Sequence, residues 1–145
     1  MQNFDHPHII KLIGISSSSG SASGVDSSIS IVMELAKFGQ LRSYLHNNRE
    51  QLDVATLLLY CCQLSSAMAY LEAKKFVHRD IAARNILVAN HECIKLADFG
   101  LSREADESIY QQMAGSGGNS KCGKLPIKWM APECWRHVER ALGGN

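Results

Sequence analysis

Two polar motifs separated by a short predicted hairpin constrain this chain more than any other feature. The first motif is His78-Arg79-Asp80 with Asn85 shortly after it, and the second is Asp98-Phe99-Gly100. The apolar runs at residues 86–88 and 94–96 lie between them and predict two antiparallel strands. Such a hairpin brings the start of its first strand close to the end of its second strand. We therefore expect the two motifs to converge at one edge.

The residue types in these motifs suit phosphoryl transfer. Carboxylate and amide oxygens are good ligands for Mg²⁺, so Asn85 and Asp98 are the predicted metal ligands. A separate carboxylate must orient the acceptor hydroxyl and take its proton, and we predict this catalytic role for Asp80, with Arg84 as a nearby cation. Each motif alone has a simpler explanation, because Asp-Phe-Gly is a common tripeptide and His-Arg-Asp also occurs as a salt-bridged turn.

The joint pattern is far more specific than its parts. His-Arg-Asp, the Asn five residues after that Asp, Asp-Phe-Gly and the later Ala131-Pro132-Glu133 have the order and spacing of the protein-kinase signature. From Phe4 to Glu133 the chain resembles a protein kinase, and more narrowly a tyrosine kinase. Ala82 stands where serine/threonine kinases usually place a Lys, and Arg84 supplies the cation instead. The segment KLPIKWMAPE at residues 124–133 agrees with this resemblance.

A finer resemblance is to the focal adhesion kinase family. The segments that carry it are FDHPHIIKLIG, VMEL, LRSYL, AMAYLEAKKFVHRDIAARNILV and KLADFGLSR. The resemblance implies a cytoplasmic, non-receptor tyrosine kinase that uses ATP and Mg²⁺ and acts on protein substrates bearing tyrosine. It also implies recruitment to focal adhesions or to the membrane surface through domains that are not in this chain.

The resemblance assigns the nucleotide-binding residues by position. Met33 would be the gatekeeper, and Leu87 would form the floor beneath the adenine ring. The hinge whose backbone meets adenine would be Glu34, Leu35 and Ala36.

The same resemblance assigns structural and substrate-binding roles. His78, Phe99 and Leu12 would belong to a stacked hydrophobic spine, although an ordinary core position also explains Leu12. Pro126 would pack against the ring of the substrate tyrosine.

Tyr110 resembles a regulatory tyrosine of the activation loop. Its phosphate would carry about two negative charges and would pair with Arg79 or Arg103, ordering the loop. Gln111 stands where the family has a second tyrosine, so a two-site switch is not expected. The alternative is an exposed loop tyrosine without a regulatory role.

The implied fold class is α+β, a two-lobed protein-kinase-like fold that is truncated here. Residues 4–36 would supply small-lobe strands and the hinge, residues 37–135 the large lobe, and residues 136–145 a divergent tail. The serine-rich insert at residues 16–30 is expected to be disordered. The family's glycine-rich loop, its strand Lys and the helices after Ala-Pro-Glu do not occur among the 145 residues. We therefore expect a partial kinase domain with no more than trace activity, or alternatively a non-catalytic interaction fragment.

Local patterns predict the remaining elements. Residues 8–15 and 29–35 predict two strands, the first of them buried, and residues 40–47 predict a short helix. Asp53 is the predicted N-cap of a long helix. Lys74 and Lys75 would lie in the last turn of that helix, where cations suit its dipole. Its buried face is expected to consist of Leu57, Cys61, Leu64, Met68 and Leu71.

Composition excludes several classes of protein. Hydrophobic residues make up 46% and charged residues 20%, which argues against global disorder. The net charge of +1 gives no electrostatic basis for general nucleic-acid binding or polybasic membrane binding. No run is expected to approach the roughly 18 apolar residues that a spanning helix needs, and the start does not resemble a signal peptide. The five cysteines, an odd number with two adjacent, indicate reduced thiols.

Overall fold

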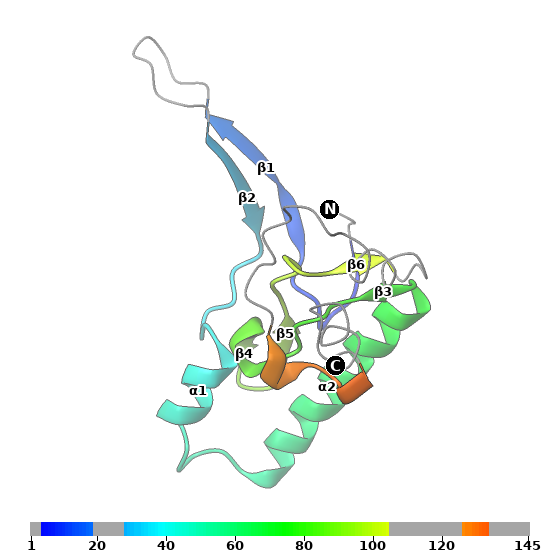
Figure 1. Ribbon diagram of the computed structural model, residues 1–145. Helices are drawn as coiled ribbons and strands as arrows, with labels where there is room; N and C mark the ends of the chain where they lie inside the picture. Colours follow the sequence, from blue (N-terminus) through cyan, green and yellow to red (C-terminus); the bar gives the residue numbers. More distant parts are fainter. Residues whose placement is uncertain (1–3, 19–27, 105–125, 134–145) are drawn as a thin grey trace. The chain divides into compact units, whose positions relative to one another are not determined.

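The computed structural model describes residues 4–18, 28–104 and 126–133 (Figure 1). The chain divides into two compact units. The first comprises Met1–Tyr70 with Ala83–Ala97, and the second comprises Leu71–Ala82 with Asp98–Asn145. The predicted regulatory residue Tyr110 and the predicted tail at residues 136–145 lie outside the described residues.

A two-stranded antiparallel ribbon begins the first unit. Strands β1 (Leu12–Ser18) and β2 (Ser28–Met33) pair with a bulge near Gly14 (Figure 1). Both predicted strands occur, and the structure pairs them with each other. The insert was wrongly predicted to be disordered throughout, because its first and last residues continue the two strands. Residues 19–27 lie outside the described part of the chain.

The prediction that residues 8–15 form a buried strand is wrong in two respects. The strand starts only at Leu12, and Ile13 and Ile15 on it are 65% and 70% exposed. In the described structure β1 and β2 pair only with each other, and these two side chains are open to solvent. The buried part of the segment is Ile9 and Ile10, where Ile9 forms a parallel bridge to Leu96.

Helix α1 (Leu41–Asn47) follows a turn at Gly39, which has a φ of 69°. A left-handed φ of this kind is readily adopted by glycine and disfavours residues with a Cβ. The helix buries Leu41 and Tyr44. The predicted short helix is therefore confirmed, and the chain reversal before it has a local cause.

Helix α2 (Val54–Ala73) is the longest element. The predicted N-cap is confirmed, because the backbone N–H of Thr56 donates to Oδ1 of Asp53 at 2.7 Å. The helix ends at Ala73, so the two lysines lie just beyond the last turn. Lys75 there has a φ of 56°, a left-handed conformation that commonly ends helices.

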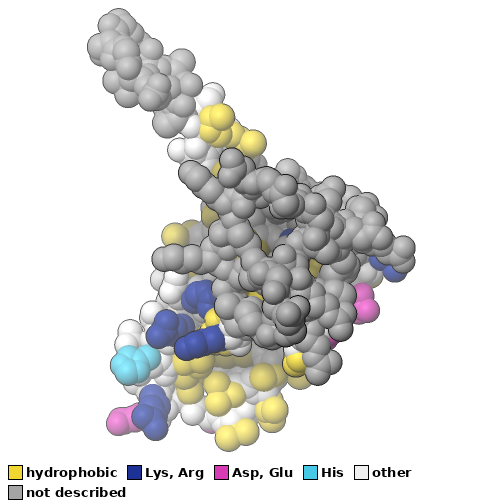
Figure 2. All heavy atoms as spheres, in the orientation of Figure 1, with side chains coloured by type: hydrophobic (Ala, Val, Ile, Leu, Met, Phe, Trp, Pro, Cys, Tyr) yellow, Lys and Arg dark blue, Asp and Glu magenta, His cyan; other side chains and the backbone are white. Residues whose placement is uncertain are grey.

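The predicted buried face of α2 is wrong at three of its five residues, since Leu71 is buried and Leu64 is half-buried. Leu57 and Met68 are 40% and 45% exposed, and Cys61 is also exposed. The residues that are buried instead are Tyr60, Gln63, Ala67 and Leu71. Exposed hydrophobic side chains gather over the first turns of this helix, at the lower edge of the view in Figure 2.

Helix α2 is also long and apolar enough to cross a membrane, judged by length and composition alone. This contradicts the expectation that no stretch approaches the length of a span. One such helix is weak evidence, because core helices of other proteins pass the same test. Tyr60 and Gln63 on this helix donate hydrogen bonds to backbone carbonyls of a neighbouring turn, so the packed face of the helix carries polar groups.

The predicted hairpin between the two motifs is confirmed. Strands β4 (Ile86–Asn90) and β5 (Cys93–Leu96) are antiparallel, with a register irregularity close to the turn. Val88, Ile94 and Leu96 are at most 2% exposed. This hairpin, rather than the β1–β2 ribbon, therefore supplies much of the core of the first unit.

The second unit is built around a very short strand pair. Strand β3 (Phe76–Val77) follows the end of α2 and pairs antiparallel with β6 (Arg103–Glu104). This pairing brings the chain just before the first motif beside the chain just after the second. The 3-10 turn η2 (Ile127–Trp129) belongs to the same unit.

Candidate active site

Within the second unit, His78 is fixed by three different contacts. Its ring lies edge-on to Phe99, with ring centroids 4.8 Å apart. Its carbonyl accepts a hydrogen bond from the Ser102 hydroxyl at 3.1 Å, and its Nδ1 accepts one from the backbone N–H of Asp80 at 3.3 Å. The two motifs are therefore joined side chain to side chain, as the spine assignment predicts for His78 and Phe99. Leu12, the third predicted spine residue, belongs to the first unit.

The backbone is strained at one residue of each motif. Arg79 has a φ of 72° and Asp98 a φ of 60°. Residues with a Cβ seldom adopt this left-handed region, and such strain, of order 1–3 kcal/mol per residue, concentrates at functional sites. In the described structure the one other non-glycine residue with a positive φ is Lys75, at the end of a helix, where the conformation is common.

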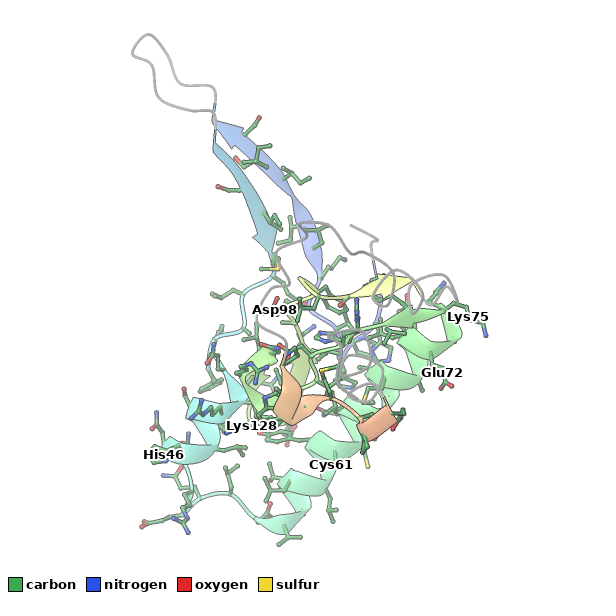
Figure 3. The ribbon with its side chains drawn as sticks, viewed as in Figure 1. His46, Cys61, Glu72, Lys75, Asp98 and Lys128 are labelled. Atoms are coloured by element: carbon green, nitrogen blue, oxygen red, sulfur yellow. The ribbon has the colours of Figure 1, made fainter. Side chains whose placement is uncertain are left out.

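The Asp98 carboxylate lies in the loop that follows β5 (Figure 3). The side chain is exposed, and its Oδ1 accepts a hydrogen bond from the backbone N–H of Gly100 at 3.3 Å. A Cβ at residue 100 would lie 3.2 Å from this same oxygen. The glycine thus leaves room for the carboxylate in its present position, a role that the sequence analysis did not identify.

Arg84 and Asn85 lie in the first unit, in the 3-10 turn η1 (Ala83–Asn85) that leads into β4. Asn85 is 6% exposed, and its carbonyl accepts a hydrogen bond from the backbone N–H of Ala97 at 2.8 Å. Ala97 directly precedes Asp98. The hydrogen bond therefore joins the two strands at the end of the hairpin opposite its turn, as expected. Asp80 and Asp98 belong to the second unit, and the convergence of the four side chains stays a prediction.

The predicted hinge leads into a segment that pairs with β4. The backbone N–H of Phe38 donates to the carbonyl of Val88 at 3.0 Å, and that of Val88 donates to the carbonyl of Gly39 at 2.8 Å. Gln40 forms an isolated bridge with Leu87, the predicted adenine floor. The chain just after Ala36 is therefore hydrogen-bonded to the strand that carries the floor residue. Two further predicted nucleotide-binding residues are exposed, Met33 at 50% and Leu35 at 83%.

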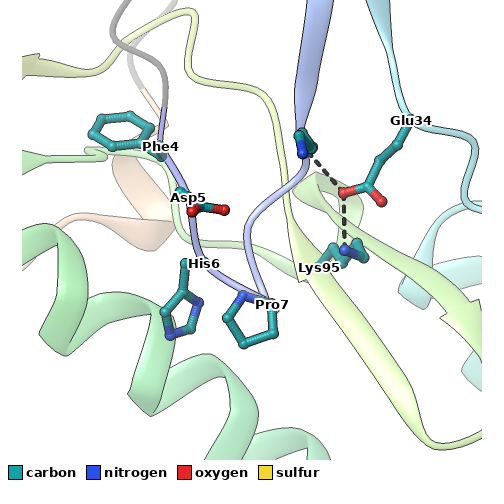
Figure 4. A pocket seen from close by; sticks show the side chains of 7 residues that line it. Phe4, Asp5, His6, Pro7, Glu34 and Lys95 are labelled. Atoms are coloured by element: carbon teal, nitrogen blue, oxygen red, sulfur yellow. Dashed lines mark hydrogen bonds and ion pairs between the residues drawn. The ribbon is translucent and has the colours of Figure 1, made fainter.

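The side chain of Glu34 has a structural role that its assignment to the hinge did not include. Its Oε1 accepts hydrogen bonds from Nζ of Lys95 and from the backbone N–H of Lys11, both at 2.8 Å (Figure 4). Burial acts to raise the pKa of Glu34, but these hydrogen bonds and the two lysine charges outweigh it and lower the pKa. The pair borders an open pocket of about 330 Å³ whose other lining residues include Phe4 and His6.

Asn85 and Asp98 carry the oxygen donors that Mg²⁺ prefers, and their convergence on one ion stays a prediction. In the described residues, no cluster of three or more His, Cys, Asp or Glu side chains is placed to hold a metal ion. Mg²⁺ usually binds through one or two carboxylates together with substrate phosphates and water, rather than in a cage of protein ligands. The oxygen donors of these two residues suit that mode of binding.

The remaining predicted site residues are placed in part. The carbonyl of Pro126 accepts a hydrogen bond from the backbone N–H of Trp129 at 2.8 Å, which closes η2. The side chain of Arg103 and all of Tyr110 lie outside the described residues. Ser102, which is 5% exposed and bonded to His78, was not predicted as part of the site. Its signal in the sequence, one Ser two residues after Asp-Phe-Gly, is too weak to identify it alone.

Comparison with known proteins decides the family. Residues 1–141 match the family described as protein tyrosine and serine/threonine kinase. The chain belongs to this family. The predicted α+β kinase fold is thereby confirmed, and the motifs described above are those of a kinase domain.

The relatives of this kinase chain include proteins named as tyrosine kinases. It is 46% identical over 146 residues to the inactive tyrosine-protein kinase kin-32 of Caenorhabditis elegans. This match covers 100% of this chain and 15% of that protein. It is 40% identical over 136 residues to the receptor tyrosine-protein kinase erbB-4 of Homo sapiens and of Mus musculus, covering 92% of this chain and 9% of theirs. The chain thus spans a small part of the curated relatives that it matches.

Proposed function

We propose that this chain carries the catalytic and metal-binding loops of a protein tyrosine kinase, which transfers the γ-phosphate of ATP to a tyrosine hydroxyl. One observation carries the proposal: the packing of His78 on Phe99, which ties together two motifs that are each strained at a functional position. Strain of this kind persists where the surrounding contacts fix the local geometry. The hydrogen bonds that His78 accepts from the Ser102 hydroxyl and from the backbone N–H of Asp80 supply such contacts.

Each side chain has one role in the proposed reaction. Asp80 orients the tyrosine hydroxyl and takes its proton, and its low exposure of 9% limits competition from water. Arg84 places a positive charge near the transferring phosphate. Asn85 and Asp98 would hold Mg²⁺, which neutralises charge on the phosphates when bound. Adenine would meet the backbone of residues 34–36 above Leu87.

The finer assignment is to a non-receptor kinase of the focal adhesion type that acts in the cytoplasm, at focal adhesions or at the membrane surface. The sequence segments quoted above support it, and Ala82 with Arg84 supports tyrosine over serine or threonine as the acceptor. Pro126 would contact the acceptor ring. Tyr110, through Arg79, would regulate the loop. The relatives include one receptor kinase, so this assignment rests on the segments alone.

A second candidate function is a non-catalytic interaction fragment. The specific observation in its favour is the set of large exposed hydrophobic side chains on β1, β2 and α2. The glycine-rich loop and strand Lys that clamp the phosphates are not among these 145 residues. We therefore expect the chain alone to give no more than trace phosphate transfer to tyrosine.

Nucleotide binding tests the proposed site directly. The probe is Mn²⁺ with ADP, and its dissociation constant is measured by electron paramagnetic resonance on the wild-type chain and on Asp98→Asn and Asn85→Ala. Each substitution removes a predicted ligand, and we expect binding at least about tenfold weaker. Glu72→Gln, at an exposed position near the end of α2, is the matched control and should bind as the wild type does.

Two results would contradict the proposal. Equal Mn²⁺–ADP binding by wild type, Asp98→Asn and Asn85→Ala would show that neither residue is a metal ligand. Transfer of phosphate from ATP to a serine peptide in preference to a tyrosine peptide would contradict the assignment of tyrosine as the acceptor. Robust transfer by the chain alone that is lost in Asp80→Asn would confirm the site and refute the expectation of trace activity.

A further inference from the structure

A buried glutamine of α2 is hydrogen-bonded to the turn of the β4–β5 hairpin. Gln63 is 8% exposed. Its Nε2 donates to the carbonyl of Glu92 at 2.6 Å, and its Oε1 accepts from the backbone N–H of Ile94 at 2.9 Å. A carbonyl only accepts and an N–H only donates, so one orientation of the amide satisfies both partners. The side chain therefore bridges the turn and the first residues of β5.

Two tyrosines hold the same turn from neighbouring positions. The Tyr60 hydroxyl donates to the carbonyl of His91 at 2.7 Å, and the Tyr44 hydroxyl lies 2.6 Å from Nδ1 of that histidine. Burial, with a smaller effect from Tyr44, raises the pKa of Tyr60 to about 12, so this hydroxyl stays protonated and keeps its donor role. Gln63 differs from both tyrosines because it also holds a backbone N–H of β5.

The opposite end of the hairpin carries a predicted metal ligand. There the carbonyl of Asn85 accepts the hydrogen bond of Ala97, the residue before Asp98. Val88, Ile94 and Leu96 fill the interior between the two ends and are at most 2% exposed. Close-packed interiors have low compressibility and transmit displacement rather than absorb it. A shift of the turn is therefore passed along the strands to the open end.

We propose that Gln63 is a positioning residue, which fixes the backbone of Asn85 and Ala97 by anchoring the far end of the hairpin that joins them. The effect on nucleotide binding rests on the proposed role of Asn85 as a metal ligand. The mechanical connection from the turn to the open end does not depend on that role.

Gln63→Met is the decisive substitution. Methionine keeps the length of the side chain but leaves the Glu92 carbonyl and the Ile94 N–H without their partner inside the protein, so the turn must shift to pair them elsewhere. We expect hydrogen exchange at the Ala97 amide to become at least about tenfold faster. The measurement is made by NMR at a temperature where the variant stays folded. Gln51→Met, the same exchange of side chains at an exposed loop position, should leave the Ala97 amide unchanged.

A double-mutant cycle separates positioning from general loss of stability. Gln63→Met should weaken Mn²⁺–ADP binding several-fold in the wild-type background and should cause no further loss beside Asn85→Ala. A merely structural effect would weaken binding equally in both backgrounds. If Gln63→Met does not fold, Gln63→Glu replaces it, because the carboxylate still accepts from Ile94 but no longer donates to Glu92.

The outcomes distinguish this inference from the proposed function. Faster exchange at Ile94 with unchanged exchange at Ala97 would overturn the inference, whatever the nucleotide result. Equal losses of Mn²⁺–ADP binding in both backgrounds would overturn it as well. Absence of Mn²⁺–ADP binding by the wild type would overturn the proposed metal site, and the exchange at Ala97 would still decide the mechanical connection.

Discussion

At the scale of single residues, four polar residues in or beside the two motifs are buried, whereas Asp98 is exposed. His78, Asp80, Asn85 and Ser102 are each at most 9% exposed. In the described part of the chain, no buried side-chain nitrogen or oxygen lacks a hydrogen-bond partner. Burying polar groups is costly unless they are paired, so these residues are held in defined positions before any substrate arrives.

Gly100→Ala is predicted to damage the site with little effect on stability. The added methyl group would lie 3.2 Å from Oδ1 of Asp98, so the exposed carboxylate must shift by a few tenths of an ångström. We expect Mn²⁺–ADP binding to weaken several-fold while the melting temperature changes by roughly 2 °C or less. Gly14→Ala is the matched control, because a Cβ at that residue meets no atom within 4 Å. Unchanged binding in Gly100→Ala would contradict this account of the glycine.

Glu34 is predicted to give a stability contribution that depends on pH. Its pKa in the folded chain is below the ordinary value of 4.5, so the contribution is fully present above that pH and is lost as the pH falls through the folded-state pKa. Glu34→Gln should therefore melt roughly 2 °C below the wild type at pH 7, and the difference should close in more acidic solution. Thermal unfolding by circular dichroism between pH 7 and pH 3 measures it. A gap that stays constant with pH would exclude the charge as its cause.

At the scale of elements, sequence patterns predicted where helices and strands lie better than which faces they bury. Helices α1 and α2 and the β4–β5 hairpin follow from local signals, such as the cap at Asp53 and the turn at Gly39. The buried face of α2 does not, because its apolar residues occur on several sides. Gln63 counts as polar in any periodicity, yet it is buried because a backbone turn satisfies both ends of its amide.

Two adjacent residues of α2 test the corrected face. Ala67 is fully buried and Met68 is 45% exposed. Ala67→Leu should overpack the interior and lower the free energy of unfolding by about 1–3 kcal/mol. Met68→Gln should change it by about 0.5 kcal/mol or less. Urea denaturation measures the free energy of unfolding of both variants. A larger loss for Met68→Gln than for Ala67→Leu would support the buried face expected from periodicity.

At the scale of the whole molecule, the family could be predicted from the sequence. Which hydrophobic surfaces of the chain are buried could not. The spacing of His-Arg-Asp, Asn, Asp-Phe-Gly and Ala-Pro-Glu indicates a kinase regardless of how the elements pack. Exposure depends instead on which elements lie against each surface. The sequence therefore predicted the partners His78 and Phe99 but not the exposed hydrophobic residues of the β1–β2 ribbon.

The chain alone is predicted to associate with itself. Ile31 on β2 and Leu58 on α2 are 50% and 61% exposed, among many large hydrophobic side chains, and surfaces of this kind favour association. Sedimentation velocity should show species larger than the monomer, and fewer of them when Ile31→Lys and Leu58→Lys are combined. Ser43→Lys with Gln51→Lys adds the same charge at exposed polar positions as a control. A monodisperse wild-type monomer with a cooperative melt would contradict the prediction.

At Arg79 and Asp98, where the backbone is left-handed, the residues that would favour stability differ from those that the proposed function needs. Glycine would adopt either conformation with less strain, so variants selected only for thermal stability would tend to replace these two residues. Under the proposed function, those replacements remove a metal ligand and a candidate partner for a regulatory phosphate. Evolution toward greater stability and evolution toward activity would therefore favour different amino acids at the same two positions.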